Sequence, residues 1–256
     1  MPTQNKANKK IKAAILIIGN EILSGRTQDL NVSFISNWLN INCGIPIFEV
    51  KIIPDVEKKI ISSIQDLSKR FKYVFTTGGI GPTHDDITAL SISKAFRKKY
   101  GFNKEAYSIL ESYYGKKNFN NARKKMAKMP SGSKLIYNPS SAAPGFMIKN
   151  ILCLPGVPSI LKSMMPNLKK FLIKGEKIES RTISLQTVES RIADYLTKLQ
   201  KKYFKNIEIG SYPFFRHGKV GVSVVLRSVN KKIISRCEAK FTDMAKKNKI
   251  KILFLK

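Results

Sequence analysis

The sequence has few of the residues that build disulfide frameworks, metal centres or membrane spans. It contains three cysteines, two histidines and one tryptophan in 256 residues. Cys43, Cys153 and Cys237 are far apart and form no C-x-x-C pair, so we expect reduced, buried thiols. No apolar run approaches the ~20 residues that a membrane-spanning helix needs. These absences argue against a disulfide-rich secreted domain and a helical membrane protein, and they predict a cytoplasmic location.

Acidic residues are also scarce. The chain contains 17 Asp and Glu residues and 47 Lys and Arg residues, which gives a formal net charge of +30. Such an excess is typical of proteins that bind nucleic acid or an anionic membrane surface. However, just nine of the basic residues are Arg, and the lysines are spread along the chain as in proteins from AT-rich genomes. We therefore expect a basic surface that attracts small anionic molecules, and regard a nucleic-acid partner as the weaker interpretation.

Short apolar runs alternate with amphipathic stretches from residue 13 to residue 176. This alternation predicts an α/β domain of three layers, in which helices cover both faces of a parallel sheet and ligands bind beyond the carboxyl ends of the strands. Residues 1–12 are polar and Lys-rich, and we expect a flexible basic tail there. Strands are expected at 13–19, 47–53, 73–76, 134–138 and 150–154, and helices at 31–43, 54–67, 86–99, 105–114, 120–128 and 158–173.

From residue 177 to residue 256 the pattern changes to β-α-β-β-α-β, which is typical of a ferredoxin-like α+β module. We therefore expect a second, smaller domain that begins near residue 177. Its strands are expected at 182–186, 207–212, 219–227 and 250–254, and its helices at 188–202 and 231–248.

The strongest candidate for a functional site is the segment TTGGIGPTHDDIT, residues 76–88. Its three glycines directly follow a strand, so the backbone can turn sharply and point several N–H groups at a bound phosphate. A helix that begins near Asp85 would direct its positive end at the same place. Asp85 and Asp86 have two interpretations: they cap this helix, or they bind a divalent cation such as Mg²⁺. His84 either contacts phosphate or is a simple turn residue.

Two further loops accompany this segment. Residues 19–31 (GNEILSGRTQDLN) follow the first strand, and residues 138–146 (NPSSAAPGF) form a small, rigid loop. Alone, the first loop is a turn that ends in a helix cap at Asn31. Its position at the carboxyl end of a strand favours a role in binding.

Together the three loops resemble the amino-terminal region of the competence/damage-inducible protein A (CinA) family, within the molybdopterin-binding superfamily that includes the MoaB and Mog proteins. Departures from the family pattern are Asn20, where the family has Asp, and Ile160, where many members have Glu. The resemblance extends over nearly the whole chain. It rests on GNEILSG with Asp29 and Asn31, TGGIGPTHDDIT, Asn138 with APGF, LPGVP at 154–158, ESRIA at 189–193 and SYP at 211–213.

The resemblance implies a molybdopterin-binding-like fold and, for this branch, metal-dependent cleavage of the pyrophosphate in ADP-ribose or FAD. It also implies a homo-oligomer, for which a dimer is the commonest form. The C-terminal amidase domain of longer family members is not expected within these 256 residues. Two alternatives remain: a protein that binds molybdopterin or a related cofactor without turnover, and a molybdopterin adenylyltransferase-like enzyme.

For the pyrophosphatase, Asp85 and Asp86 are the expected catalytic metal ligands for Mg²⁺, Mn²⁺, Co²⁺ or Ni²⁺. Glu21 is the candidate base or supporting ligand. The nucleotide or pterin is expected to bind at residues of all three loops: Thr77, Gly78, Gly79, Gly81, Pro82 and Thr83, then Gly19, Asn20, Ser24, Gly25 and Asn31, and finally Ala143, Pro144 and Gly145.

Overall fold

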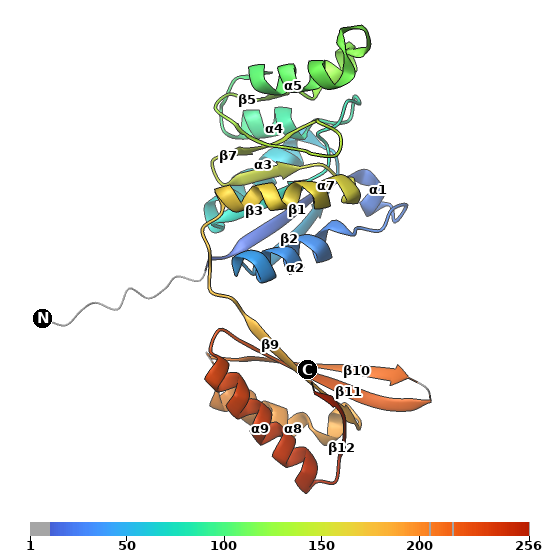
Figure 1. Ribbon diagram of the computed structural model, residues 1–256, viewed down its shortest axis with the longest axis vertical. Coiled ribbons are helices and arrows are strands. Elements are labelled where there is room, and N and C mark those ends of the chain that lie inside the picture. The colour runs from blue at the N-terminus through green and yellow to red at the C-terminus, as the bar shows by residue number, and fades with distance from the viewer. Residues whose placement is uncertain (1–10, 205, 217, 256) are drawn as a thin grey trace, which may run out of the picture. The chain divides into compact units, whose positions relative to one another are not determined.

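The computed structural model describes residues 11–204, 206–216 and 218–255. Residues 1–10 of the expected basic tail lie outside this description. The chain divides into two compact units, Met1–Gly175 and Glu176–Lys256, and each contains its own sheet (Figure 1). Within the described residues, no helix has both the length and the apolar character needed to cross a membrane.

The first unit contains a six-stranded sheet in the order β2-β1-β3-β8-β7-β6. Neighbouring strands are parallel from β2 to β8, whereas β7 and β6 are antiparallel additions. This arrangement confirms the predicted fold class, although the sheet is mixed at one edge. The strands are β1 (Ala13–Ile18), β2 (Ile47–Ile53), β3 (Tyr73–Thr77), β6 (Lys134–Ile136), β7 (Gly145–Ile148) and β8 (Ile151–Leu154).

Helices cover both faces of this sheet, as Figure 1 shows. The strand β1, which lies between β2 and β3, is buried along its whole length because alternate side chains enter separate cores on its two faces. One core contains Ile60, Ile64 and Leu67 of α3 (Glu57–Arg70), and burial of each stabilises the fold by about 1.5–3 kcal/mol. The opposite core is covered by α2 (Asn31–Cys43), α7 (Pro158–Met164) and the 3₁₀ turn Met165–Phe171. The other elements are α1 (Asn20–Leu23), α4 (Thr88–Ala95), β4 (Tyr100–Phe102), α5 (Lys104–Tyr114), the 3₁₀ turn Lys116–Asn118, α6 (Asn121–Lys125) and β5 (Lys128–Pro130).

The helix after the Gly-rich segment is shorter than expected. It begins at Thr88 and not near Asp85, so the interpretation of Asp85 and Asp86 as helix caps is wrong. Thr88 fixes the start of the helix because its N–H donates to the Gly79 carbonyl (2.9 Å) and its hydroxyl donates to the Gly78 carbonyl (3.0 Å). The loop is therefore tied to the first turn of α4.

The cap expected at Asn31 is also wrong. Asn31 is the first residue of α2, and the carboxylate of Asp29 accepts the N–H of Val32 at 2.8 Å. Asn31 instead donates its side-chain amide to the Gly156 carbonyl at 2.7 Å. Its role is to hold the loop after β8 close to the start of α2.

The second unit has the predicted β-α-β-β-α-β order, and its sheet runs β10-β11-β9-β12 with antiparallel neighbours. Its two helices bury their apolar residues in a core shared with one face of this sheet, so the second unit has a core of its own. The elements are β9 (Glu179–Gln186), the 3₁₀ turn Glu189–Arg191, α8 (Ala193–Lys202), β10 (Glu208–Arg216), β11 (Lys219–Ser228), α9 (Lys231–Lys247) and β12 (Lys251–Leu255).

Candidate functional site

A cavity of about 660 Å³ opens at the carboxyl ends of the four parallel strands of the first unit. Gly19 lies at the end of β1, Asp55 follows β2, Gly78 follows β3 and Pro155 follows β8. Parallel strands end at the same edge of a sheet, so residues that are distant in sequence meet there. The topology therefore predicts a ligand site at the place where the cavity lies.

The Gly-rich loop forms one wall of this cavity and needs glycine for its shape. Gly78 and Gly79 have φ angles of 96° and 67°, a region that side chains disfavour. A Cβ on Gly78 would lie 2.1 Å from the Ile18 carbonyl oxygen, and one on Gly79 would lie 2.2 Å from the Thr88 hydroxyl. The loop consequently packs directly on the end of β1 and on the start of α4.

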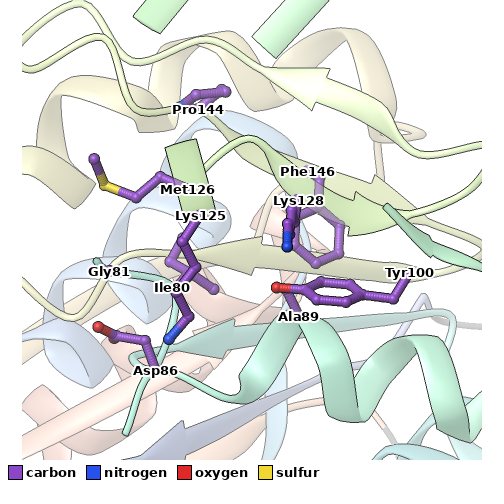
Figure 2. Close-up of a pocket in the computed structure, with 10 residues that line it drawn as sticks. All are labelled: Ile80, Gly81, Asp86, Ala89, Tyr100, Lys125, Met126, Lys128, Pro144 and Phe146. Carbon is purple, nitrogen blue, oxygen red and sulfur yellow. The ribbon is translucent and has the colours of Figure 1, made fainter. Parts of the chain in front are cut away.

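Asp86 holds the second half of the loop together. Its carboxylate accepts the backbone N–H of Thr83 at 2.8 Å and also accepts the Thr83 hydroxyl. The ammonium group of Lys125 donates to the Thr83 carbonyl and lies on the same side of the neighbouring hollow as Asp86 (Figure 2). Asp86 is therefore engaged in organising the loop.

Asp85 is the more exposed of the two aspartates. Hydrogen bonding from Thr83 lowers the pKa of Asp85, and its own backbone N–H acts in the same direction. The Thr83 hydroxyl has one proton, which is donated to Asp86 in this structure and can serve only one carboxylate at a time. An exposed aspartate is ionised at neutral pH without any shift, so the Asp85 carboxylate is available to a cation.

Four carboxylates line this one cavity: Glu21, Asp55, Asp85 and Asp86. Asp55 accepts the backbone N–H of Asn20 at 2.8 Å. Burial raises the pKa of Asp55, the hydrogen bond from Asn20 opposes this, and the negative charges of the other three carboxylates raise it further. In a chain with a net charge of +30, this cavity is a local concentration of negative charge.

These oxygen donors fit a hard divalent cation such as Mg²⁺ or Mn²⁺. Among the described residues, no three His, Cys, Asp or Glu side chains converge into a ready-made metal cluster. The donor set thus fits a cation held by one or two carboxylates that takes its remaining ligands from phosphate and water, a common arrangement for Mg²⁺.

A second wall comes from the end of α5, from α6 and the residue after it, and from the 138–144 loop. Tyr114, Arg123, Met126 and Pro144 line it. The buried Asn138 shapes the loop, because its amide donates to Ser141 Oγ (2.8 Å) and to the Ala143 carbonyl (2.9 Å). This wall combines apolar surface with one guanidinium group.

Comparison with known proteins agrees with this geometry. Residues 14–174 match the family described as probable molybdopterin binding domain. The chain belongs to this molybdopterin-binding family. Residues 177–253 match the middle domain of FAD synthase.

Individual relatives support the assignment. A protein of Archaeoglobus fulgidus is 34% identical over 78% of this chain and 84% of its own length, and one of Sulfurisphaera tokodaii is 35% identical over 75% and 76%. The crystal structure of CinA from Thermoplasma acidophilum, a protein described as of unknown function, has a TM-score of 0.59 and 30% identity. It covers 63% of this chain and 99% of its own. The expected resemblance to CinA is confirmed.

Most of the site residues predicted for this family member line the cavity, whereas seven of them do not. His84 is exposed on the loop and is not among the lining residues. Gly145 lies in β7, where a Cβ would be 2.4 Å from the Cys153 carbonyl oxygen. The lining residues are Gly19, Glu21, Gly78, Gly79, Gly81, Pro82, Asp85, Asp86, Ala143 and Pro144; those outside the lining are Asn20, Ser24, Gly25, Asn31, Thr77, Thr83 and Gly145.

Three polar or aromatic residues of the cavity lie outside the loops singled out from the sequence: Asp55, Tyr114 and Arg123. Thr27, Asn138 and Ser141 lie within those loops but were not named as binding residues. Asp55 had a usable signal, because it directly follows a predicted parallel strand just as the Gly-rich loop does. Tyr114 and Arg123 had no such signal in the sequence, since they belong to helices whose position over the sheet is not encoded in the local spacing of residues.

Proposed function

We propose that this molybdopterin-binding family member is a metal-dependent nucleotide pyrophosphatase acting on ADP-ribose- or FAD-like dinucleotides. The observation that carries the proposal is that one cavity joins a Gly-rich loop to four carboxylates. The loop supplies N–H groups for phosphate, and the carboxylates supply ligands and proton acceptors for hydrolysis. The cavity volume of about 660 Å³ is within the usual range for small-molecule sites.

In the proposed reaction, water adds to one phosphorus atom, the P–O–P bond breaks, and two monophosphates leave. The Gly78 N–H is already donated to the Leu154 carbonyl at 3.2 Å, so the backbone N–H groups of residues 79–81 bind the phosphates. Asp86 keeps that loop in shape through Thr83. Asp85 and its neighbours would hold the divalent cation, which neutralises phosphate charge when bound. The raised pKa of Asp55 makes it a stronger proton acceptor than an ordinary aspartate, so Asp55 joins Glu21 as a candidate base.

A second function is favoured by the contacts of Asp86. The carboxylate accepts the backbone N–H and the hydroxyl of Thr83, and both bonds stay within the loop, as expected of a residue that shapes a binding cradle without taking part in chemistry. The alternative is therefore a protein that holds molybdopterin or a related phosphate-bearing heterocycle without turnover. An adenylyltransferase-like reaction at the same loop is a variant of this alternative.

The test is product analysis by chromatography after incubation of the protein with ADP-ribose or FAD and Mg²⁺, Mn²⁺, Co²⁺ or Ni²⁺. We expect AMP to appear with at least one metal, and Asp85→Asn to slow its release by about 10²-fold or more. Asp85→Asn should leave the melting temperature nearly unchanged, because Asp85 is exposed. Asp86→Asn should lower both activity and melting temperature, because it weakens the bonds to Thr83.

Asp243→Asn is the matched control, since Asp243 is an exposed aspartate on α9 of the second unit. It should change neither quantity. Full activity of both loop variants would contradict the metal-site claim. Absence of AMP with every metal, together with retention of a pterin on the purified protein, would establish the binding alternative.

A further inference from the structure

Arg123 is distinctive among the residues of the cavity. The chain has 47 Lys and Arg, yet Arg123 is the only one of them among the described residues that line this cavity. Four carboxylates line the same space, but none of the ion pairs found among the described residues includes Arg123. A half-buried guanidinium that shares a cavity with carboxylates but pairs with none of them is available to an anionic ligand.

The guanidinium is also held in one orientation. Its central carbon lies 4.2 Å from the centre of the Tyr114 ring, and Nη1 donates to the Asn118 carbonyl at 2.5 Å. The backbone N–H of Arg123 donates to the side chain of Asn120 at 3.0 Å, which fixes the start of α6. A guanidinium has five N–H donors, so these contacts leave most of its donors for a ligand.

Stacking and a hydrogen bond to backbone reduce the conformational freedom that Arg loses on binding, and its planar fork matches two oxygens of a phosphate group. The loop at residues 79–81 lines the same cavity and supplies a second set of phosphate donors, its backbone N–H groups. The cavity thus has two different phosphate-binding elements. A ligand with two linked phosphoryl groups can use both, whereas a monophosphate can use only one.

We propose that Arg123 binds the second phosphoryl group of a diphosphate-bridged ligand and thereby selects such ligands over monophosphates, with Tyr114 as its positioning residue. The proposal deepens the proposed function, on whose cavity it rests, but it concerns binding and does not require turnover. The same geometry assigns the apolar wall of Met126 and Pro144 to the ligand moiety attached to that phosphate.

The experiment compares affinities for ADP-ribose and AMP, and for inorganic pyrophosphate and phosphate, by isothermal titration calorimetry in Mg²⁺. Wild-type protein should bind the diphosphate member of each pair more tightly. Arg123→Ala should weaken diphosphate binding by roughly 10- to 100-fold, the value of one or two charged hydrogen bonds, and change monophosphate binding much less. Arg123→Lys keeps the charge but not the fork, and should recover part of the loss.

Lys124→Ala is the matched control, because Lys124 is the next residue of α6, is half-buried like Arg123 and does not line the cavity. It should leave both affinities unchanged. Tyr114→Phe keeps the aromatic face and should bind as wild type does, whereas Tyr114→Ala should weaken diphosphate binding less than Arg123→Ala does. Melting curves of each variant identify losses of affinity that come from unfolding. If an alanine variant is unfolded, the affinities of Arg123→Lys and Tyr114→Phe test the proposal in its place.

Three results would overturn the proposal: equal affinity of wild-type protein for pyrophosphate and phosphate, unchanged diphosphate affinity in Arg123→Ala, or equal loss for both ligand classes. Failure of the proposed function gives a different pattern. Selective binding without AMP release would leave this proposal intact and reject hydrolysis. Hydrolysis with an unchanged KM in Arg123→Ala would reject this proposal and leave the pyrophosphatase in place.

Discussion

At the scale of single residues, Asp55 links the electrostatics of the cavity to stability. Burial and three neighbouring carboxylates raise its pKa, so the folded protein holds the Asp55 proton more tightly than the unfolded chain does. Ionised Asp55 therefore destabilises the fold above its folded-state pKa, and this penalty disappears below the unfolded-state pKa of about 3.9. Asp55→Asn removes the charge and keeps an oxygen for the Asn20 N–H.

We expect Asp55→Asn to be more stable than the wild type at neutral pH, and the difference to shrink as the pH falls through the folded-state pKa towards the ordinary aspartate range. Denaturant-induced unfolding of both proteins between neutral and acidic pH measures this difference in the free energy of unfolding. If the stability difference between Asp55→Asn and the wild type widens on acidification, the pKa of Asp55 is not raised in the folded protein. Divalent cation should also reduce the difference if the cation binds among these carboxylates.

The same residues show what local sequence can predict about a site. The Gly-rich loop was recognisable because its conformational demands are local: glycine is needed at positions 78 and 79 whatever the rest of the chain does. The role of Asp86 could not be recognised from the sequence, because it depends on a loop that turns the Asp86 carboxylate back to Thr83. Arg123 reaches the cavity only through the packing of α5 and α6, which no spacing in the sequence describes.

At the scale of elements, the helix α5 ends at Tyr114 and begins with a side-chain cap. The Asn103 carboxamide oxygen accepts the N–H of Ala106 at 2.9 Å. Asn103→Ala removes this acceptor and should lower the free energy of unfolding by about 1 kcal/mol. Chemical denaturation measures the loss. Asn118→Ala is the control, because Asn118 accepts the Arg123 guanidinium with its backbone carbonyl, which Ala retains. A similar loss of stability in Asn118→Ala would argue against the cap.

Element boundaries explain where the sequence-based fold was incomplete. Strong periodicity identified α2, α3 and α9, whose buried residues recur at helical spacing. The strands β4, β5 and β7 were missed, because three or four residues are too few to show alternation. The helix predicted at 86–99 was too long at both ends, because α4 begins at Thr88 and ends at Ala95. Just beyond its end, Arg97 adopts a positive φ of 53°.

At the scale of the whole molecule, the two units have separate hydrophobic cores and separate sheets. Every residue that lines the candidate cavity lies between Ile18 and Ile160, inside the first unit. The match to a molybdopterin-binding family over residues 14–174 covers the same part of the chain. The dimer expected from the resemblance stays a prediction, and none of these observations depends on it.

This separation leads to a prediction about the first unit alone. Residues 1–175 should fold and bind ADP-ribose in Mg²⁺ with the affinity of the full chain, because they contain the whole lining of the cavity and both cores around its sheet.

The stability of the fragment depends on the residue at which it ends. The N–H of Gly175 donates to the Cys43 carbonyl at 2.7 Å, and the N–H of Ile173 donates to the Tyr73 hydroxyl at 2.9 Å. A fragment that ends at Phe171 loses both bonds and should melt at a lower temperature than the 1–175 fragment. Circular dichroism melts and calorimetric titration of the two fragments and the full chain provide the comparison. If the 1–175 fragment is fully folded yet binds more weakly than the full chain, residues 176–256 contribute to the site, and the assignment of ligand binding to the first unit alone is wrong.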